Sequence, residues 1–126
     1  MRTFILTALM ILGALTAGAR AQHIKATATF PMSQNGNVTF GFTLNNAASG
    51  PNVNSGIGTV DSINGIKVNF GVTWIRNAAN KVLVSFDGIW VFAPCGMPRT
   101  TKPKDKGHAW LNDNDPPSKG NWTATK

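Results

Sequence analysis

The stretch FAPCGMPRTTKPKDKGHAW (92–110) places a cysteine, Cys95, thirteen residues before a histidine, His108. A thiol becomes a nucleophile when a base lies within hydrogen-bond reach and the surroundings favour the thiolate. No third orienting group and no family signature accompany this pair, so the sequence predicts a free thiol just past the end of a strand. Because an odd cysteine in a secreted chain can pair with another molecule, a Cys95-linked dimer is the alternative to a monomer.

Metal binding is a second kind of chemistry that these residues suggest. Apart from His108, the chain has one other histidine, His23, and imidazole nitrogens are good ligands for Cu(II). Asp113 and Asp115, in the segment LNDNDPPSKGNW, add carboxylate oxygens. Copper binding by these four residues is therefore the alternative, whereas the favoured prediction is a protein without a cofactor.

The same residues resemble the periplasmic copper-carrier family of CopC type. That resemblance implies a secreted β-sandwich whose copper ligands come from a histidine at the mature N-terminus and from a C-terminal Asp-x-His-Pro segment. Asp115 stands where that segment has its histidine, and Gln22 precedes the histidine at the predicted N-terminus. The matching positions lie at the two ends of the chain: His23, Pro31, Asp113-Asn114-Asp115-Pro116, Gly120 and Trp122.

Tryptophans and basic residues are the favoured candidates for a binding surface. Exposed tryptophans on a secreted domain pack on sugars or on partner proteins, and the basic segment 99–106 suits an anionic surface. No aromatic residue interrupts that segment, so specific recognition of nucleic acid is not expected. The candidate surface residues are Trp90, Trp110, Trp122, Arg99, Lys102, Lys104 and Lys106.

Other motifs carry weaker signals. The sequons Asn37-Val38-Thr39 and Asn121-Trp122-Thr123 make Asn37 and Asn121 acceptors for N-glycosylation if the source is eukaryotic. The chain contains five aspartates and no glutamate, and nothing in the pattern indicates the buried, perturbed carboxyl group that acid–base catalysis needs. The sequence therefore predicts a protein that is not an enzyme.

Residues 1–21 have the features of a secretory signal peptide. Arg2 precedes a short apolar run at 4–15, and Ala19-Arg20-Ala21 puts small residues at the −3 and −1 positions of a cleavage site. The run is too short to cross a bilayer, and no other long apolar run follows, so no transmembrane span is expected. The predicted mature chain has 105 residues and a net charge of +5, and we expect it to be extracellular, or periplasmic in a bacterium.

Strands and tight turns must position these groups. Asn35-Gly36, Asn64-Gly65 and Asp87-Gly88 each separate two alternating apolar and polar runs, which is typical of β-hairpins with type I′ turns. Three such hairpins predict an all-β, antiparallel sandwich or small barrel of about six to seven strands. The segment 45–56 is expected to be a long crossing loop between the first two hairpins.

Five prolines follow position 93, so residues 99–126 are predicted to form an irregular basic tail, able at most to dock one last short strand. The expected organisation is a signal peptide (1–21), a β-sandwich domain (22–98) and this tail (99–126). The favoured function is a small secreted, non-catalytic binding protein whose partner is an anionic or carbohydrate surface or an extracellular protein.

Overall fold

The computed structural model describes residues 23–32, 36–45 and 54–126, and the predicted signal peptide lies outside these residues. Eight strands account for most of the described chain. Their bounds are β1 His23–Met32, β2 Gly36–Asn45, β3 Ser55–Ile63, β4 Ile66–Arg76, β5 Val82–Phe86, β6 Ile89–Pro94, β7 Lys106–Leu111 and β8 Ser118–Ala124.

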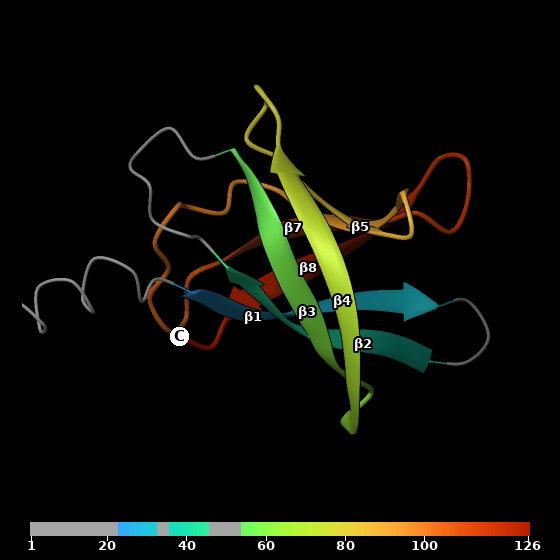
Figure 1. Ribbon diagram of the computed structural model, residues 1–126. Helices are drawn as coiled ribbons and strands as arrows, with labels where there is room; N and C mark the ends of the chain where they lie inside the picture. The colour runs from blue at the N-terminus through green and yellow to red at the C-terminus, as the bar shows by residue number, and fades with distance from the viewer. Residues whose placement is uncertain (1–22, 33–35, 46–53) are drawn as a thin grey trace, which may run out of the picture.

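The strands form a closed up-and-down barrel (Figure 1). Each strand pairs antiparallel with the next one along the chain, and β8 returns to pair with β1 through the partners Ala26↔Ala124 to Thr29↔Asn121. One end of the barrel, the turn end, carries the connections β1–β2, β3–β4, β5–β6 and β7–β8. The opposite end, the loop end, carries the connections β2–β3, β4–β5 and β6–β7.

This architecture confirms the all-β prediction and selects the barrel from the two predicted alternatives. The strand count was too low, and the prediction of an irregular tail was wrong, because residues 99–126 contain β7 and β8, which close the barrel. Ser55 and Gly56, at the end of the predicted crossing loop, belong to β3, which pairs directly with β2. Residues 46–53 of the predicted crossing loop lie outside the described residues.

Two of the three predicted hairpin turns have the positive φ values that a type I′ turn requires at both central residues. Asn64 and Gly65 have φ values of 51° and 79°, and Asp87 and Gly88 have φ values of 54° and 82°. Both central residues of a type I′ turn need positive φ, which asparagine, aspartate and glycine tolerate best. At the first turn Gly36 has a φ of 75°, whereas Asn35 lies outside the described residues.

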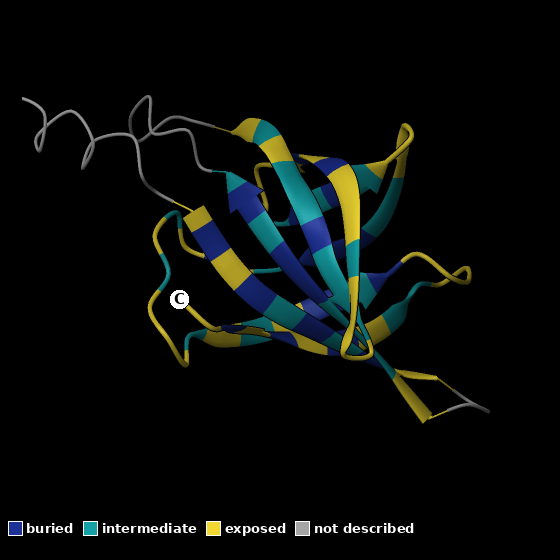
Figure 2. Ribbon diagram, turned by 60° about the horizontal axis from the view of Figure 1, so that its bottom comes forward, coloured by how far each residue is buried: buried dark blue, intermediate teal, exposed yellow. Residues whose placement is uncertain are grey.

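The core follows the alternation of side chains along each strand (Figure 2). In β1 every second residue from Ile24 to Phe30 is buried, and in β8 every second residue from Gly120 to Ala124 is buried. The loop end of the interior is filled by large side chains, including Trp74, Trp122 and Met97, which are all buried. Met97 belongs to the β6–β7 connection, so this segment helps to close the loop end of the barrel.

The β6–β7 connection is held to its surroundings by several hydrogen bonds. The Arg76 guanidinium donates to the carbonyl oxygen of Met97, and Arg99 donates to the Asn54 side chain over 2.7 Å. Farther along, the Lys104 amide donates to the Ala124 carbonyl over 3.1 Å.

Within the described part of the chain, no helix has the length and apolar character needed to span a bilayer.

Candidate functional site

An apolar pocket of about 180 Å³ opens inside the barrel on the side of the turn end. Its walls come from five consecutive strands, β2 to β6. All the lining side chains are apolar: Phe40, Val60, Ile63, Phe70, Val72, Val84, Phe86, Val91 and Phe92.

The floor of the pocket is a cluster of aromatic rings. The rings of Phe40 and Phe92 stack with centroids 5.3 Å apart and planes 7° apart. Phe92 also contacts Phe42, at 4.9 Å between centroids, and Phe30, at 6.5 Å. Because Phe30, Phe42 and Phe92 are fully or almost fully buried, the core beneath the pocket is preformed.

The rim of the pocket is a pair of phenylalanines that occupy inward-facing strand positions and are nevertheless exposed. Phe70 alternates in phase with buried Val72 and Trp74, and Phe86 alternates in phase with buried Val84. Their exposed fractions are 44% and 47%, and their rings meet edge to face at 5.9 Å. Two apolar side chains on the core side of a barrel therefore remain accessible to a molecule in the pocket.

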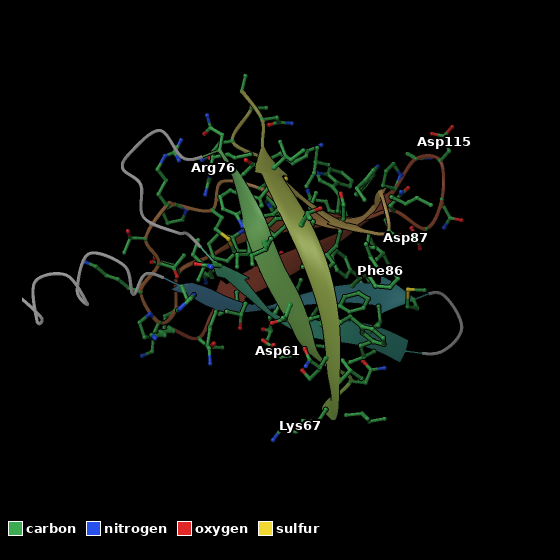
Figure 3. The ribbon with its side chains drawn as sticks, in the orientation of Figure 1. Asp61, Lys67, Arg76, Phe86, Asp87 and Asp115 are labelled. Atoms are coloured by element: carbon green, nitrogen blue, oxygen red, sulfur yellow. The ribbon has the colours of Figure 1, made fainter. Side chains whose placement is uncertain are left out.

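Unequal strand lengths explain why this end stays open. β4 has eleven residues and β5 has five, so β4 pairs with β5 only from Thr73 to Arg76. The first half of β4, which carries Phe70, runs past the turn that follows β5. Figure 3 shows Phe86 near β4, with the charged side chains of Lys67 and Asp87 farther toward the hairpin tips. The interior of the pocket is thus lined by apolar side chains, and the charged groups lie beyond its rim.

Two buried tryptophans on the loop-end side of the core each pack against a glycine of the neighbouring strand, and we call each such pair a tryptophan corner. At one corner Trp122 pairs across strands with Gly107, and its indole Nε1 donates to the Cys95 carbonyl over 2.8 Å. At the other corner Trp74 pairs with Gly56, but its buried Nε1 has no hydrogen-bond partner. In both corners the glycine leaves the space that the indole ring occupies, so these two rings are structural parts of the core.

The structure separates the three tryptophans that the sequence proposed for a binding surface. Trp122 is only 1% exposed and belongs to the core, so it cannot contact a surface partner as predicted. Trp90 and Trp110 are partly exposed on the outer side of β6 and β7. The Trp110 ring has the Lys81 ammonium 6.0 Å from its centroid.

The proposed basic residues all lie on or next to the β6–β7 connection. Lys102, Lys104 and Lys106 are exposed, whereas Arg99 is partly buried. Arg76 lies in the same region, and burial, together with the positive charge of Arg99, lowers its pKa below the ordinary value. The binding role of these cations stays a prediction.

Cys95 and His108 are connected through their backbones. The Cys95 amide donates to the His108 carbonyl over 2.8 Å, and its Sγ lies 3.7 Å from the Ala93 carbonyl. Cys95 is a partly exposed free thiol, as predicted. The geometry therefore gives Cys95 a structural role through its main chain, and a Cys95-linked dimer remains a prediction.

The residues proposed for copper are dispersed. His23 begins β1 at the loop end, His108 lies on the outer face of β7, and Asp113 and Asp115 lie in the β7–β8 connection at the turn end. The described residues contain no group of three or more His, Cys, Asp or Glu side chains able to hold a metal ion. Asp113 instead accepts hydrogen bonds from the amide and hydroxyl of Ser118, at 3.1 and 2.8 Å. The copper alternative gains no support from this geometry.

Sequence reasoning missed the pocket. The alternation of apolar and polar residues places Phe40, Phe70 and Val72 on the inner face of their strands, but it does not indicate how far the barrel is filled. The available signal was the apolar residues beside the turns, such as Ile63, Ile66, Phe86 and Ile89, of which the last three are exposed.

The fold and the pocket define a closed eight-stranded up-and-down barrel with an apolar opening at its turn end. Comparisons of the chain with protein-family models, with curated proteins and with solved structures find no match.

Proposed function

We propose that this chain is a secreted, non-catalytic binding protein that holds a small apolar molecule in the turn-end pocket. Barrels of eight strands are wide enough either to be filled by side chains or to hold one small ligand. This barrel combines both arrangements, since its loop end is packed and its turn end is not. The observation that carries the proposal is the exposure of Phe70 and Phe86 at inward-facing positions.

The size of the pocket sets the class of ligand. An apolar cavity of about 150 Å³ accommodates a molecule such as benzene, so about 180 Å³ suits a single ring or a short alkyl chain. No hydrogen-bonding side chain lines the pocket, so binding would depend on the hydrophobic effect and on contacts with aromatic rings. Burying about eight carbon atoms gives at most about 6 kcal/mol, which corresponds to a Kd of tens of micromolar.

Fluorescence of N-phenyl-1-naphthylamine, a neutral probe, tests this proposal, because its phenyl ring can enter the pocket while its naphthyl group stays at the open rim. The probe should brighten on binding to the protein, and toluene should displace it in a saturable way. Phe86→Ser should weaken probe binding by about five- to tenfold, because half-buried ring contacts are worth about 1 kcal/mol. Ile75→Ser is a suitable control, because Ile75 is 56% exposed on the outer side of β4.

The variants separate specific from nonspecific binding. Unchanged binding by Ile75→Ser with weakened binding by Phe86→Ser supports a site in the pocket. Equal loss in both variants, or probe fluorescence that toluene does not reduce, would show that the probe adheres to general surface hydrophobicity and would overturn the proposal.

A further inference from the structure

A second feature lies outside the pocket, on the outer wall formed by β7, β8 and β1. These neighbouring strands pair in register, so their outward side chains form rows across the wall. One row contains His108, Asn121 and Thr29, and the next contains Lys106, Thr123 and Thr27. Trp110 stands opposite Lys119 in a third row. We call this surface the polar wall.

The charges of the polar wall all have one sign. Lys25, Lys106 and Lys119 are exposed on its three strands, and Lys81 approaches the Trp110 ring from β5's start. None of the five aspartates lies on these outward strand positions: Asp61 is on β3, Asp87, Asp113 and Asp115 are at the turn end, and Asp105 precedes β7. Figure 3 shows Asp87 and Asp115 far from the loop end, where Arg76 is labelled.

The polar wall also presents hydrogen-bonding groups next to a flat ring. Two neighbouring rows, about 7 Å apart along each strand, carry these groups. They are the hydroxyls of Thr27 and Thr123 in one row, and the amide of Asn121 and the imidazole of His108 in the other. A shallow surface depression borders Lys106, His108, Asn121 and Thr123. Trp110 is partly exposed at one edge of the wall, and Lys81 Nζ lies 6.0 Å from the centroid of its ring. An indole ring is a surface on which the apolar side of a sugar ring can pack.

From this combination we infer that the polar wall binds an anionic polysaccharide, with Trp110 stacking on a sugar ring and Lys106 and Lys119 pairing with its acidic groups. Charge complementarity selects a polyanion. Of the exposed large aliphatic side chains, Ile57, Ile66, Ile75 and Ile89 lie on β3, β4 and β6. Met32 lies at the turn end of β1, beyond the residues that pair with β8, so the wall lacks the groups that would insert into a lipid surface. A single aromatic ring also gives no series of platforms for stacked nucleic-acid bases.

The polar wall shares no residue with the turn-end pocket, so a test of one proposal does not decide the other. Asn121 lies in the middle of the polar wall and is also a glycosylation acceptor in the sequence. A glycan there would cover the surface, so the inference requires an unmodified Asn121.

Retardation of the native protein in gels containing polygalacturonate, a polyuronate, tests the inference. The protein should be retarded by polygalacturonate more than by neutral dextran. Trp110→Ala should reduce the apparent affinity by about tenfold, because stacking on a ring contributes beyond electrostatic attraction. Trp90→Ala is the matched control, since Trp90 is another partly exposed tryptophan on an outer face but belongs to β6.

A charge-removing pair of variants completes the test. Lys106→Gln should weaken the retardation and its salt dependence, whereas Lys67→Gln, which removes a cation at the turn end, should change neither. The inference is overturned if Trp110→Ala binds as tightly as Trp90→Ala. It is also overturned if phosphatidylglycerol vesicles or single-stranded DNA bind more tightly than polygalacturonate, or if the mass of the secreted protein shows a glycan on Asn121.

Discussion

Gly107 and Trp122 form a contact that can be tested by adding one methyl group. A Cβ atom at Gly107 would lie 2.5 Å from Trp122 Nε1 and 2.8 Å from the Cys95 carbonyl oxygen. Neither atom can retreat easily, because Trp122 is 1% exposed and the oxygen belongs to the backbone. Gly107→Ala must therefore displace the indole and break its 2.8 Å hydrogen bond to Cys95.

Two costs determine the magnitude. Overpacking of a filled core costs about 1–3 kcal/mol, and leaving a buried donor without its partner costs about 1–3 kcal/mol more. We therefore expect Gly107→Ala to lower the free energy of unfolding by about 2–6 kcal/mol. A domain of this size loses several degrees of Tm per kcal/mol, so the Tm should fall by about 10 °C or more.

Two other glycines provide graded controls for the same substitution. At Gly56 a Cβ would lie 2.7 Å from Trp74 Nε1, but that nitrogen has no hydrogen bond to lose, so Gly56→Ala should cost less than Gly107→Ala. At Gly71 a Cβ would meet nothing within 4 Å, so Gly71→Ala should be neutral or slightly stabilising. Urea unfolding followed by tryptophan fluorescence measures all three. A Gly107→Ala protein as stable as Gly71→Ala would refute the tight Trp122 corner.

Three further predictions concern closure of the barrel and the β6–β7 connection. Deletion of residues 99–126 should abolish cooperative unfolding, because it removes β7 and β8; a deletion protein that keeps a sharp thermal transition would contradict this. Met97→Ala should lower the free energy of unfolding by about 2–5 kcal/mol, since the side chain is fully buried against the core; a urea midpoint equal to that of the wild type would count against it. Cys95→Ser should change the same free energy by less than about 1 kcal/mol, because Cys95 acts mainly through its amide and carbonyl; a large loss of stability would instead assign the thiol a packing role.

The first six strands could be predicted because their signals are local. Asn64-Gly65 and Asp87-Gly88 mark hairpin turns whatever the rest of the chain does, and alternation along β1, β2 and β4 identifies the inward faces. β7 escaped prediction, and β8 was predicted only as one last short strand that the tail could dock, because small residues such as Gly107, Ala109 and Gly120 occupy many of their inward positions. These residues are small because of distant neighbours: a Cβ at Gly120 would lie 2.1 Å from the Thr29 carbonyl oxygen.

The pocket escaped prediction for a related reason. Alternation indicates that Phe70 and Phe86 share the inner side of the barrel with Trp74 and Val84. Whether that side is filled depends on how far β4 extends beyond β5, which is fixed by pairing across the whole barrel. A local pattern of alternation indicates which side of the sheet a side chain faces. It does not indicate whether other side chains fill the space that this side chain faces.

The most direct test of the central claim is a titration of the methyl-labelled protein with toluene, followed by the NMR shifts of individual methyl groups. A ligand in the turn-end pocket should produce saturable shifts at Val60, Ile63, Val72 and Val84, which line it, and none at Ile57 and Ile75 on the outer side of the barrel. Shifts that are absent from the lining methyls, or that grow linearly and equally at both sets, would contradict a ligand site inside the barrel.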